Sequence, residues 1–180
     1  MKQFHKPLTA IILIFVFSFF TACSSSTLPF SKQEQTTTEK VKLYGAYKVL
    51  RIVDGDTFVA DIDGTQTKIR LIGVDTPESV HPDSSRNSDE GKTASEYTKS
   101  LLENKNVYLE YDVSRNDKYG RTLAYVYLDE NTMLQDLLLQ NGYAQIMTIQ
   151  PNSKYADKFY AEQQIARENA KGFWKDYFVN

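Results

Sequence analysis

Hydrophobic and polar positions alternate along most of the chain after residue 40. Runs rich in β-branched and aromatic residues predict strands, and the pair Asp63-Gly64 predicts a hairpin between the second and third of them. A period of about 3.6 residues predicts helices. The predicted strands are residues 44–53, 57–62, 65–74, 106–112 and 123–128, and the predicted helices are 93–103, 133–140 and 155–170. The polar stretch 80–91 is expected to be a long loop.

This order of three strands, a helix, two strands and two helices predicts an α+β domain over residues 41–180. Five short strands suit a small barrel, so we expect a five-stranded OB-fold β-barrel with three helices, an architecture that often binds oligonucleotides. Arg70 and Asp75 are an odd number of residues apart, so a regular strand would place them on opposite faces. For both to reach one site the strand must bend, and Gly73 is the expected position.

The first 22 residues follow a different pattern. Two lysines precede an almost unbroken apolar run over residues 8–20, which is too short to cross a bilayer and is typical of a signal peptide. Thr21-Ala22-Cys23 then resembles a bacterial lipoprotein processing box. We therefore expect residues 1–22 to be a lipoprotein signal peptide and Cys23 to carry the lipid. An ordinary signal peptide or an uncleaved anchor is the alternative.

Residues 23–40 are rich in Ser, Thr, Gln and Lys and have no hydrophobic period, which predicts a flexible tether. We therefore expect the domain to lie outside the cytoplasm, anchored to the bacterial cell membrane through Cys23. The chain has one cysteine and therefore no internal disulfide. Its formal net charge of -2 argues against tight, non-specific wrapping of nucleic acid. A polyanionic substrate would need a local basic cluster or a bound cation.

Three short polar clusters interrupt the strand pattern. Residues 54–57 (Asp-Gly-Asp-Thr) lie between two predicted strands, and their two carboxylates point the same way on extended backbone. Residues 70–78 carry an arginine and two acids around a Thr-Pro kink, and residues 117–121 (Asp-Lys-Tyr-Gly-Arg) precede the last strand. Taken singly, the first cluster has the composition of an Asp-Gly turn, the second that of a strand-end salt bridge with a loop acid, and the third that of a charged β-turn.

Taken together, the clusters have the chemistry of phosphodiester hydrolysis. Asp56, Asp75 and Glu78 supply carboxylate oxygens without His or Cys, which favours calcium or magnesium over zinc. Arg70 and Arg121 carry planar donors that match phosphate oxygens. Carboxylates for a metal, arginines for a phosphate and one spare acid predict a hydrolytic site.

The same clusters resemble, in order and separation, the three signatures of the staphylococcal-nuclease (thermonuclease) family. The signatures correspond to residues 53–57, 70–78 and 117–125, and the match runs from about residue 44 to residue 174. The resemblance implies a calcium-dependent endonuclease that cuts DNA and RNA, with single-stranded or locally open substrate favoured, and leaves 3′-phosphate ends. Nothing in the sequence requires a protein partner or more than a monomer.

The resemblance also implies how calcium is held. Asp56 and Asp75 would ligate the ion through their side chains, and Thr76 would ligate it through its main-chain carbonyl. Asp54 would lie behind these ligands without touching the ion.

The remaining matched residues would act on the substrate. Glu78 would orient or deprotonate the attacking water, and Arg70 and Arg121 would bind the phosphate and stabilise the charge of the transition state. Lys118 and Tyr119 would contact the substrate.

One departure from the family concerns the nucleotide base. The family carries base-stacking tyrosines shortly after the segment that corresponds to residues 142–144, but residues 145–150 contain no aromatic side chain. We therefore predict weaker nucleotide binding unless Tyr119, Tyr143 or Tyr155 replaces them. Two further hypotheses are a catalytically silent nucleic-acid-binding surface lipoprotein and an adhesion or scaffold lipoprotein. The presence of all five expected site side chains favours the enzyme.

Overall fold

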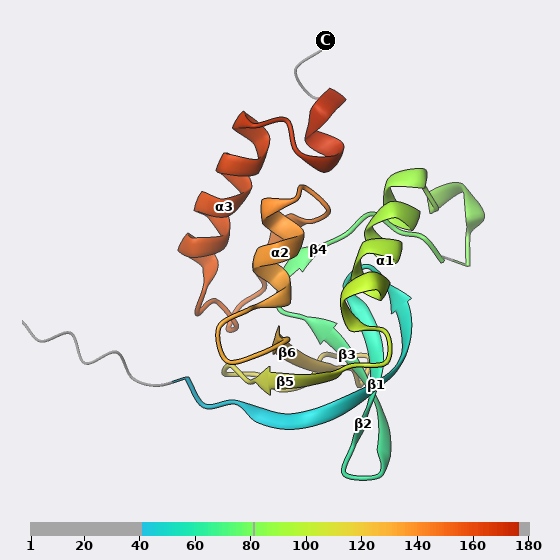
Figure 1. The fold of residues 1–180 in the computed structure, drawn as a ribbon, viewed down its shortest axis with the longest axis vertical. Helices are drawn as coiled ribbons and strands as arrows, with labels where there is room; N and C mark the ends of the chain where they lie inside the picture. Colours follow the sequence, from blue (N-terminus) through green and yellow to red (C-terminus); the bar gives the residue numbers. More distant parts are fainter. Residues whose placement is uncertain (1–40, 81, 177–180) are drawn as a thin grey trace, which may run out of the picture. The chain divides into compact units, whose positions relative to one another are not determined.

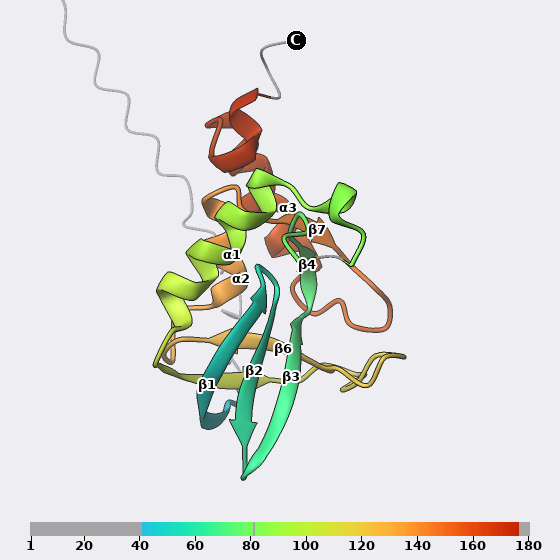
Figure 2. The same cartoon turned by 90° about the vertical axis from the view of Figure 1, so that its right-hand side faces the viewer.

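Five strands form a closed barrel in the computed structural model, which describes residues 41–80 and 82–176 (Figures 1 and 2). The predicted signal peptide, the predicted tether and Cys23 lie outside these residues. The strands are β1 (Tyr44–Asp54), β2 (Thr57–Ile62), β3 (Thr65–Leu71), β5 (Asn106–Glu110) and β6 (Thr122–Tyr127). Their order around the barrel is β1-β2-β3-β6-β5, and only the β3–β6 pair is parallel. The structure confirms the expected barrel architecture and α+β class.

The third predicted strand is divided into two. β3 ends at Leu71, and β4 (Gly73–Asp75) leaves the barrel to pair antiparallel with β7 (Gln145–Met147). Gly73 has a φ of 82°, and a Cβ there would lie 2.7 Å from the ring of Phe159. A side chain at this position would be both strained and obstructed. The bend is therefore at the position that the sequence predicted, whereas β7 is too short to show a period and was not predicted.

The described residues form three α-helices outside the barrel: α1 (Asp89–Leu102), α2 (Leu134–Gln140) and α3 (Ala156–Glu168). α1 begins four residues before the predicted start, so the prediction of a loop up to residue 91 was wrong. The Ser88 side chain accepts a hydrogen bond from the Gly91 N–H (3.0 Å) and caps the helix. The polar residues that suggested a loop are this cap and an acidic first turn, which suits a helix N-terminus.

The helices pack around the barrel as Figures 1 and 2 show, with α1 against β1 and α2 between β6 and α3. Fully buried Phe58, Tyr125 and Phe159 are among the largest core side chains, and burying a side chain of this kind stabilises the fold by about 1.5–3 kcal/mol. Buried Gln135 of α2 accepts from the Val126 N–H (3.1 Å) and donates to the Ala124 carbonyl (3.1 Å). None of the helices described is long and apolar enough to cross a membrane.

Candidate active site

Asp54, the last residue of β1, anchors the turn into β2. It is buried, and its Oδ1 accepts hydrogen bonds from the Gly55 N–H (2.9 Å) and from the Ser79 hydroxyl (2.6 Å). The Gly55 carbonyl accepts from the Thr98 hydroxyl of α1 (2.6 Å). These bonds tie the β1–β2 turn to the segment after β4 and to α1, so Asp54 holds the first cluster against the second.

Asp56 and Arg70 meet because β2 and β3 are paired. Thr57 lies opposite Arg70 in the ladder, and the Leu71 N–H donates to the Asp56 carbonyl (3.0 Å). The Asp56 carboxylate contacts Arg70 Nη1 through Oδ2 at 2.5 Å, and the same oxygen accepts from the Thr76 N–H (3.0 Å). Both side chains are buried.

Arg70 also reaches Asp75, as the predicted bend at Gly73 requires. Its Nη2 donates to Asp75 Oδ1 (2.8 Å), and its Nη1 donates to the Val74 carbonyl (3.0 Å). One guanidinium group therefore bridges two carboxylates that come from different parts of the chain. Burial raises the pKa of Asp56, and the positive charge of Arg70 opposes that rise.

The oxygen atoms around Arg70 suit a hard cation. Asp56 and Asp75 offer carboxylates, and Thr76 offers a main-chain carbonyl. The hydroxyl of Thr76 is buried and has no hydrogen-bond partner among the described residues. Within residues 41–80 and 82–176, no three His, Cys, Asp or Glu side chains lie together as a metal cluster. A calcium ion, which takes 6–8 oxygen ligands, would thus need water and a substrate oxygen beside these few protein ligands.

Glu78 lies three residues after Asp75, on the loop that leads towards α1. Its main-chain carbonyl accepts from the Ser88 N–H (3.0 Å). A Cβ on Gly91 would lie 2.2 Å from that carbonyl oxygen, so only glycine permits this approach of the loop to the helix. The main chain of Glu78 is therefore fixed against the first turn of α1, while its side chain is half-buried.

The third cluster is a turn built around the Asp117 carboxylate. Its Oδ1 accepts from the N–H groups of Tyr119 and Arg121 (both 2.9 Å), and its Oδ2 accepts from Arg121 Nε (2.6 Å). Partial burial opposes ionisation, but the hydrogen bonds from Arg121 and Tyr119 outweigh it and hold the pKa of Asp117 below its ordinary value. The contact with Asp117 is therefore made through Nε of the Arg121 guanidinium.

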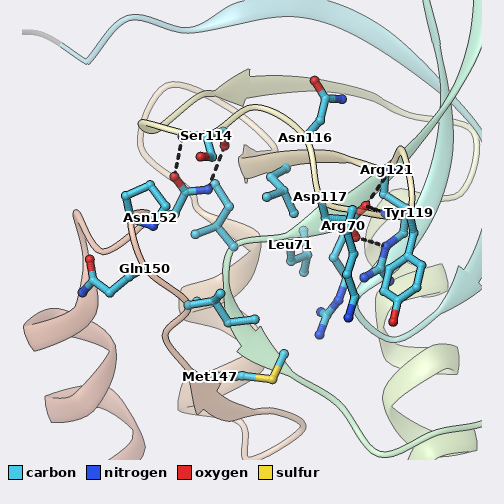
Figure 3. Close-up of a pocket in the computed structure, with 16 residues that line it drawn as sticks. Arg70, Leu71, Ser114, Asn116, Asp117, Tyr119, Arg121, Met147, Gln150 and Asn152 are labelled. Carbon is cyan, nitrogen blue, oxygen red and sulfur yellow. Dashed lines mark hydrogen bonds and ion pairs between the residues drawn. The ribbon is translucent and has the colours of Figure 1, made fainter.

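Arg70 and Arg121 line one cleft of about 430 Å³ (Figure 3). Figure 3 shows Arg70, Tyr119 and Arg121 gathered on one side of it, with Met147 on another. Lys118 adds a third cation, while an apolar wall includes Leu71, Ile72, Leu123, Met147 and Ile149. The cleft can therefore receive an anionic group against the cations and a flat, weakly polar group against the apolar wall.

The structure places the three tyrosines considered for base stacking in different surroundings. Tyr119 lines the cleft and is 72% exposed, with Arg121 Cζ 5.6 Å from its ring centroid. Tyr143 packs on Tyr97 with ring centroids 4.6 Å apart, and the Tyr155 hydroxyl donates to Glu110 (2.9 Å). Of the three, only Tyr119 is available to a substrate in this cleft.

The expected site residues fall into two groups. Arg70 contacts both Asp56 and Asp75, and Arg121, Lys118 and Tyr119 join Arg70 in the cleft. The residues that line the cleft do not include Asp54, Asp56, Asp75, Thr76 or Glu78. Sequence reasoning missed Met147, Ile149 and Asn152, which line the same cleft; those at 147 and 149 lie in the segment noted for its lack of aromatic residues.

These features define a small OB-type barrel protein of the α+β class with a cation-lined cleft beside two acid side chains. Residues 68–176 match the family described as "Staphylococcal nuclease homologue". The chain belongs to this family. The matched stretch contains the second and third polar clusters and begins after the first.

Several named proteins are similar to this chain over most of its length. Thermonuclease of Staphylococcus hyicus is 44% identical over 130 residues, which are 72% of this chain and 76% of that protein. Thermonuclease of Staphylococcus intermedius is 43% identical over 130 residues, with the same shares of the two chains. Endonuclease YncB of Bacillus subtilis (strain 168) is 38% identical over 126 residues, which are 69% of this chain and 59% of that protein.

Proposed function

We propose that this protein is a calcium-dependent endonuclease that hydrolyses phosphodiester bonds of DNA and RNA and leaves 3′-phosphate ends. The observation that carries the proposal is the Arg70 guanidinium, which contacts Asp56 and Asp75 and also lines the cleft with Arg121. The names of the similar proteins, thermonuclease and endonuclease, support the same reaction class.

The acid side chains behind the cleft would hold the metal. Asp56 and Asp75 would ligate it through carboxylate oxygens and Thr76 through its carbonyl, while Asp54 keeps the β1–β2 turn in place through Ser79. Bound calcium would neutralise the phosphate and lower the pKa of nearby water. The oxygen-only composition of this set agrees with calcium and disfavours zinc.

The cleft arginines would act on the phosphate. Arg70 and Arg121 would donate to its non-bridging oxygens and stabilise the negative charge that increases in the transition state. Glu78 would orient the attacking water and accept its proton. Attack at phosphorus breaks the bond to the 5′ oxygen, which leaves as an alcohol after protonation and leaves the phosphate on the 3′ side.

The shape of the cleft favours substrate that is single-stranded or locally open. Tyr119 and the wall formed by Met147 and Ile149 can contact a base only if that base is unpaired and unstacked. Contacts to phosphate carry no information about the sugar, which is consistent with cleavage of both DNA and RNA.

The proposed setting is extracytoplasmic. We propose that the protein is anchored to the bacterial cell membrane through lipid on Cys23, acts as a monomer and needs no protein partner. A labelled fatty acid fed to cells should mark the protein and should not mark Cys23→Ser. Labelling of that variant would contradict the anchor.

The test of activity uses the purified protein, single-stranded DNA and RNA, and calcium with and without a chelator. We expect cleavage to stop with the chelator and to yield 3′-phosphate ends. Arg121→Ala should lower kcat/KM by about 10²–10³-fold, the usual effect of losing one donor to a developing oxyanion. Glu78→Gln should lower kcat because the amide cannot accept the proton from water.

Two control variants isolate these effects. Arg51→Ala removes an exposed arginine from β1, and Glu96→Gln removes an acid from α1, and neither residue lines the cleft. Both should retain full activity. Cleavage that persists in the chelator, or full activity in Glu78→Gln and Arg121→Ala, would refute the mechanism. Binding of nucleic acid without any cleavage would favour the catalytically silent alternative.

A further inference from the structure

A second group of aromatic and cationic side chains lies outside the cleft. The rings of Tyr44 and Tyr111 have centroids 5.1 Å apart, and Arg115 Cζ lies 4.5 Å from the Tyr111 centroid and 5.8 Å from that of Tyr44. Lys42 Nζ lies 5.1 Å from the Tyr44 centroid. We call these four residues the Tyr44–Tyr111 platform. They border a hollow of about 310 Å³.

The two cations of the platform are not neutralised by neighbouring acids. Within the described residues, neither Lys42 nor Arg115 forms an ion pair with a carboxylate, and both are exposed. Lys42, followed by Arg115, also holds the pKa of the Tyr44 hydroxyl below its usual range, despite some opposing desolvation. The platform therefore presents positive charge on top of two aromatic rings.

The acids of the same hollow are already engaged with the interior. Glu110 is buried, pairs with Lys154 and accepts from the Tyr155 hydroxyl (2.9 Å). Asp112 Oδ2 accepts from the Tyr125 hydroxyl (3.0 Å) and from the Lys154 N–H (3.1 Å). Glu110 is thus compensated by Lys154, and Asp112 leaves a single negative charge beside the two cations of the platform.

The hollow and the active-site cleft share one wall. Ser114 and Asn116 line the cleft, whereas Arg115 between them lines the hollow. Asn152 of the cleft accepts from the Ser114 N–H (2.7 Å) and donates to the Ser114 carbonyl (2.8 Å), as Figure 3 shows. On this fixed segment Val113 is 72% exposed. A chain that leaves the cleft over residues 112–116 would therefore reach the platform.

We propose that the Tyr44–Tyr111 platform is a second contact for single-stranded nucleic acid, filled by nucleotides that continue from the cleft across residues 112–116. The proposal rests on the proposed nuclease function, since it concerns the same substrate. A base would stack on the planar guanidinium of Arg115, which lies over the Tyr111 ring, and Lys42 would bind an adjoining phosphate. A membrane surface fits less well, because Tyr44 and Tyr111 are half-buried and do not project as aromatic membrane anchors do.

The test compares a dinucleotide with a 20-nucleotide single strand as substrates of the purified protein. Arg115→Ala should raise KM for the 20-mer at least about fivefold, the lower end of what one stacked base contributes. Its kcat, and its KM for the dinucleotide, which is too short to reach the platform, should change less than twofold. Arg115→Lys keeps the charge but not the planar group and should have an intermediate KM. Arg51→Ala is the matched control and should have no effect on either substrate.

Three results would overturn the proposal. The first is an unchanged KM for the 20-mer, and the second is an equal rise of KM for both substrates, which would indicate a disturbed cleft. The third is that Arg115→Ala lowers binding to phosphatidylglycerol vesicles while 20-mer kinetics stay the same, which would identify a membrane contact. If the wild type cuts neither substrate, the proposed function fails instead. In that case the platform is tested by binding alone: fluorescence anisotropy of a labelled 20-mer should show weaker binding to Arg115→Ala than to wild type, and equal binding would overturn the proposal.

Discussion

Arg70 is the residue on which the electrostatics of the site depend. A buried guanidinium group is unfavourable unless it is paired and hydrogen-bonded, and Asp56, Asp75 and the Val74 carbonyl satisfy it. The converse also holds, because Asp56 is buried and would be costly to ionise without that cation. Each charge therefore stabilises the other. The contacts with Asp56 and Asp75 also hold Arg70 in one orientation where it lines the cleft.

The exposed ring of Tyr119 is expected to contribute to substrate binding, which can be tested by removing it. Tyr119→Ala should raise KM for a single-stranded substrate at least about fivefold, since one stacked base contributes about 1–3 kcal/mol, and should leave kcat nearly unchanged. Steady-state kinetics measures both constants. Tyr160→Ala, which removes a tyrosine that is 56% exposed on α3, is the matched control. An unchanged KM for Tyr119→Ala would exclude Tyr119 as the base contact.

Some contacts between residues followed from the sequence and others did not. The meeting of Arg70 with Asp75 was predictable, because their odd spacing required a bend and Gly73 was the residue able to supply it. The apolar wall of the cleft was not, because Met147 belongs to a three-residue strand and Ile149 to the loop after it. Neither segment is long enough for a periodic pattern to indicate which way its side chains point.

At the scale of elements, the first turn of α1 determines where the Glu78 loop lies. Ser88 contributes to both, since its side chain caps the helix and its N–H donates to the Glu78 carbonyl. The sequence predicted the helix but not this start, because a polar cap and an acidic first turn have the same composition as a loop. The helix and the acid that it positions could therefore not be connected before the structure was known.

The close contact between Gly91 of α1 and the Glu78 loop is expected to be needed for full activity. Gly91→Ala would place a Cβ 2.2 Å from the Glu78 carbonyl oxygen, so the loop or the helix must shift. We expect kcat to fall at least about tenfold because a displacement near 1 Å at a reacting group is enough for losses of this size. Lys92→Ala changes the next, exposed position and should keep its kcat. Equal kcat values for Gly91→Ala and wild type would show that Glu78 tolerates the shift.

At the scale of the whole molecule, closure of the barrel brings the three polar clusters together. β1, β2 and β3 place the first two side by side, and the parallel β3–β6 pair adds the third. The order of the clusters and the OB-type barrel were predictable from strand patterns and spacing. The Tyr44–Tyr111 platform was not, because its two rings are 67 positions apart and nothing local marks their contact.

The proposed calcium binding should raise the thermal stability of the whole domain. A ligand that binds only the folded state at 100 times its Kd stabilises it by about 2.7 kcal/mol, so calcium should raise the wild-type Tm by several degrees. Asp75→Ala removes a proposed ligand and should abolish that rise. Asp157→Ala, which removes an exposed acid from α3, should retain it. Scanning calorimetry with calcium and with chelator measures the shift, and a full response of Asp75→Ala would contradict the proposed ligand set.

The bridge formed by Arg70 has a consequence for the order in which ligands arrive. Counted by formal charge, one guanidinium between two carboxylates leaves one negative charge in excess. A divalent ion at these oxygens would reverse that excess to a single positive charge, and each linkage of a nucleic-acid backbone carries a single negative one. The polymer would therefore bind more readily after the proposed metal than before it, with Arg121 and Lys118 of the cleft adding to the attraction.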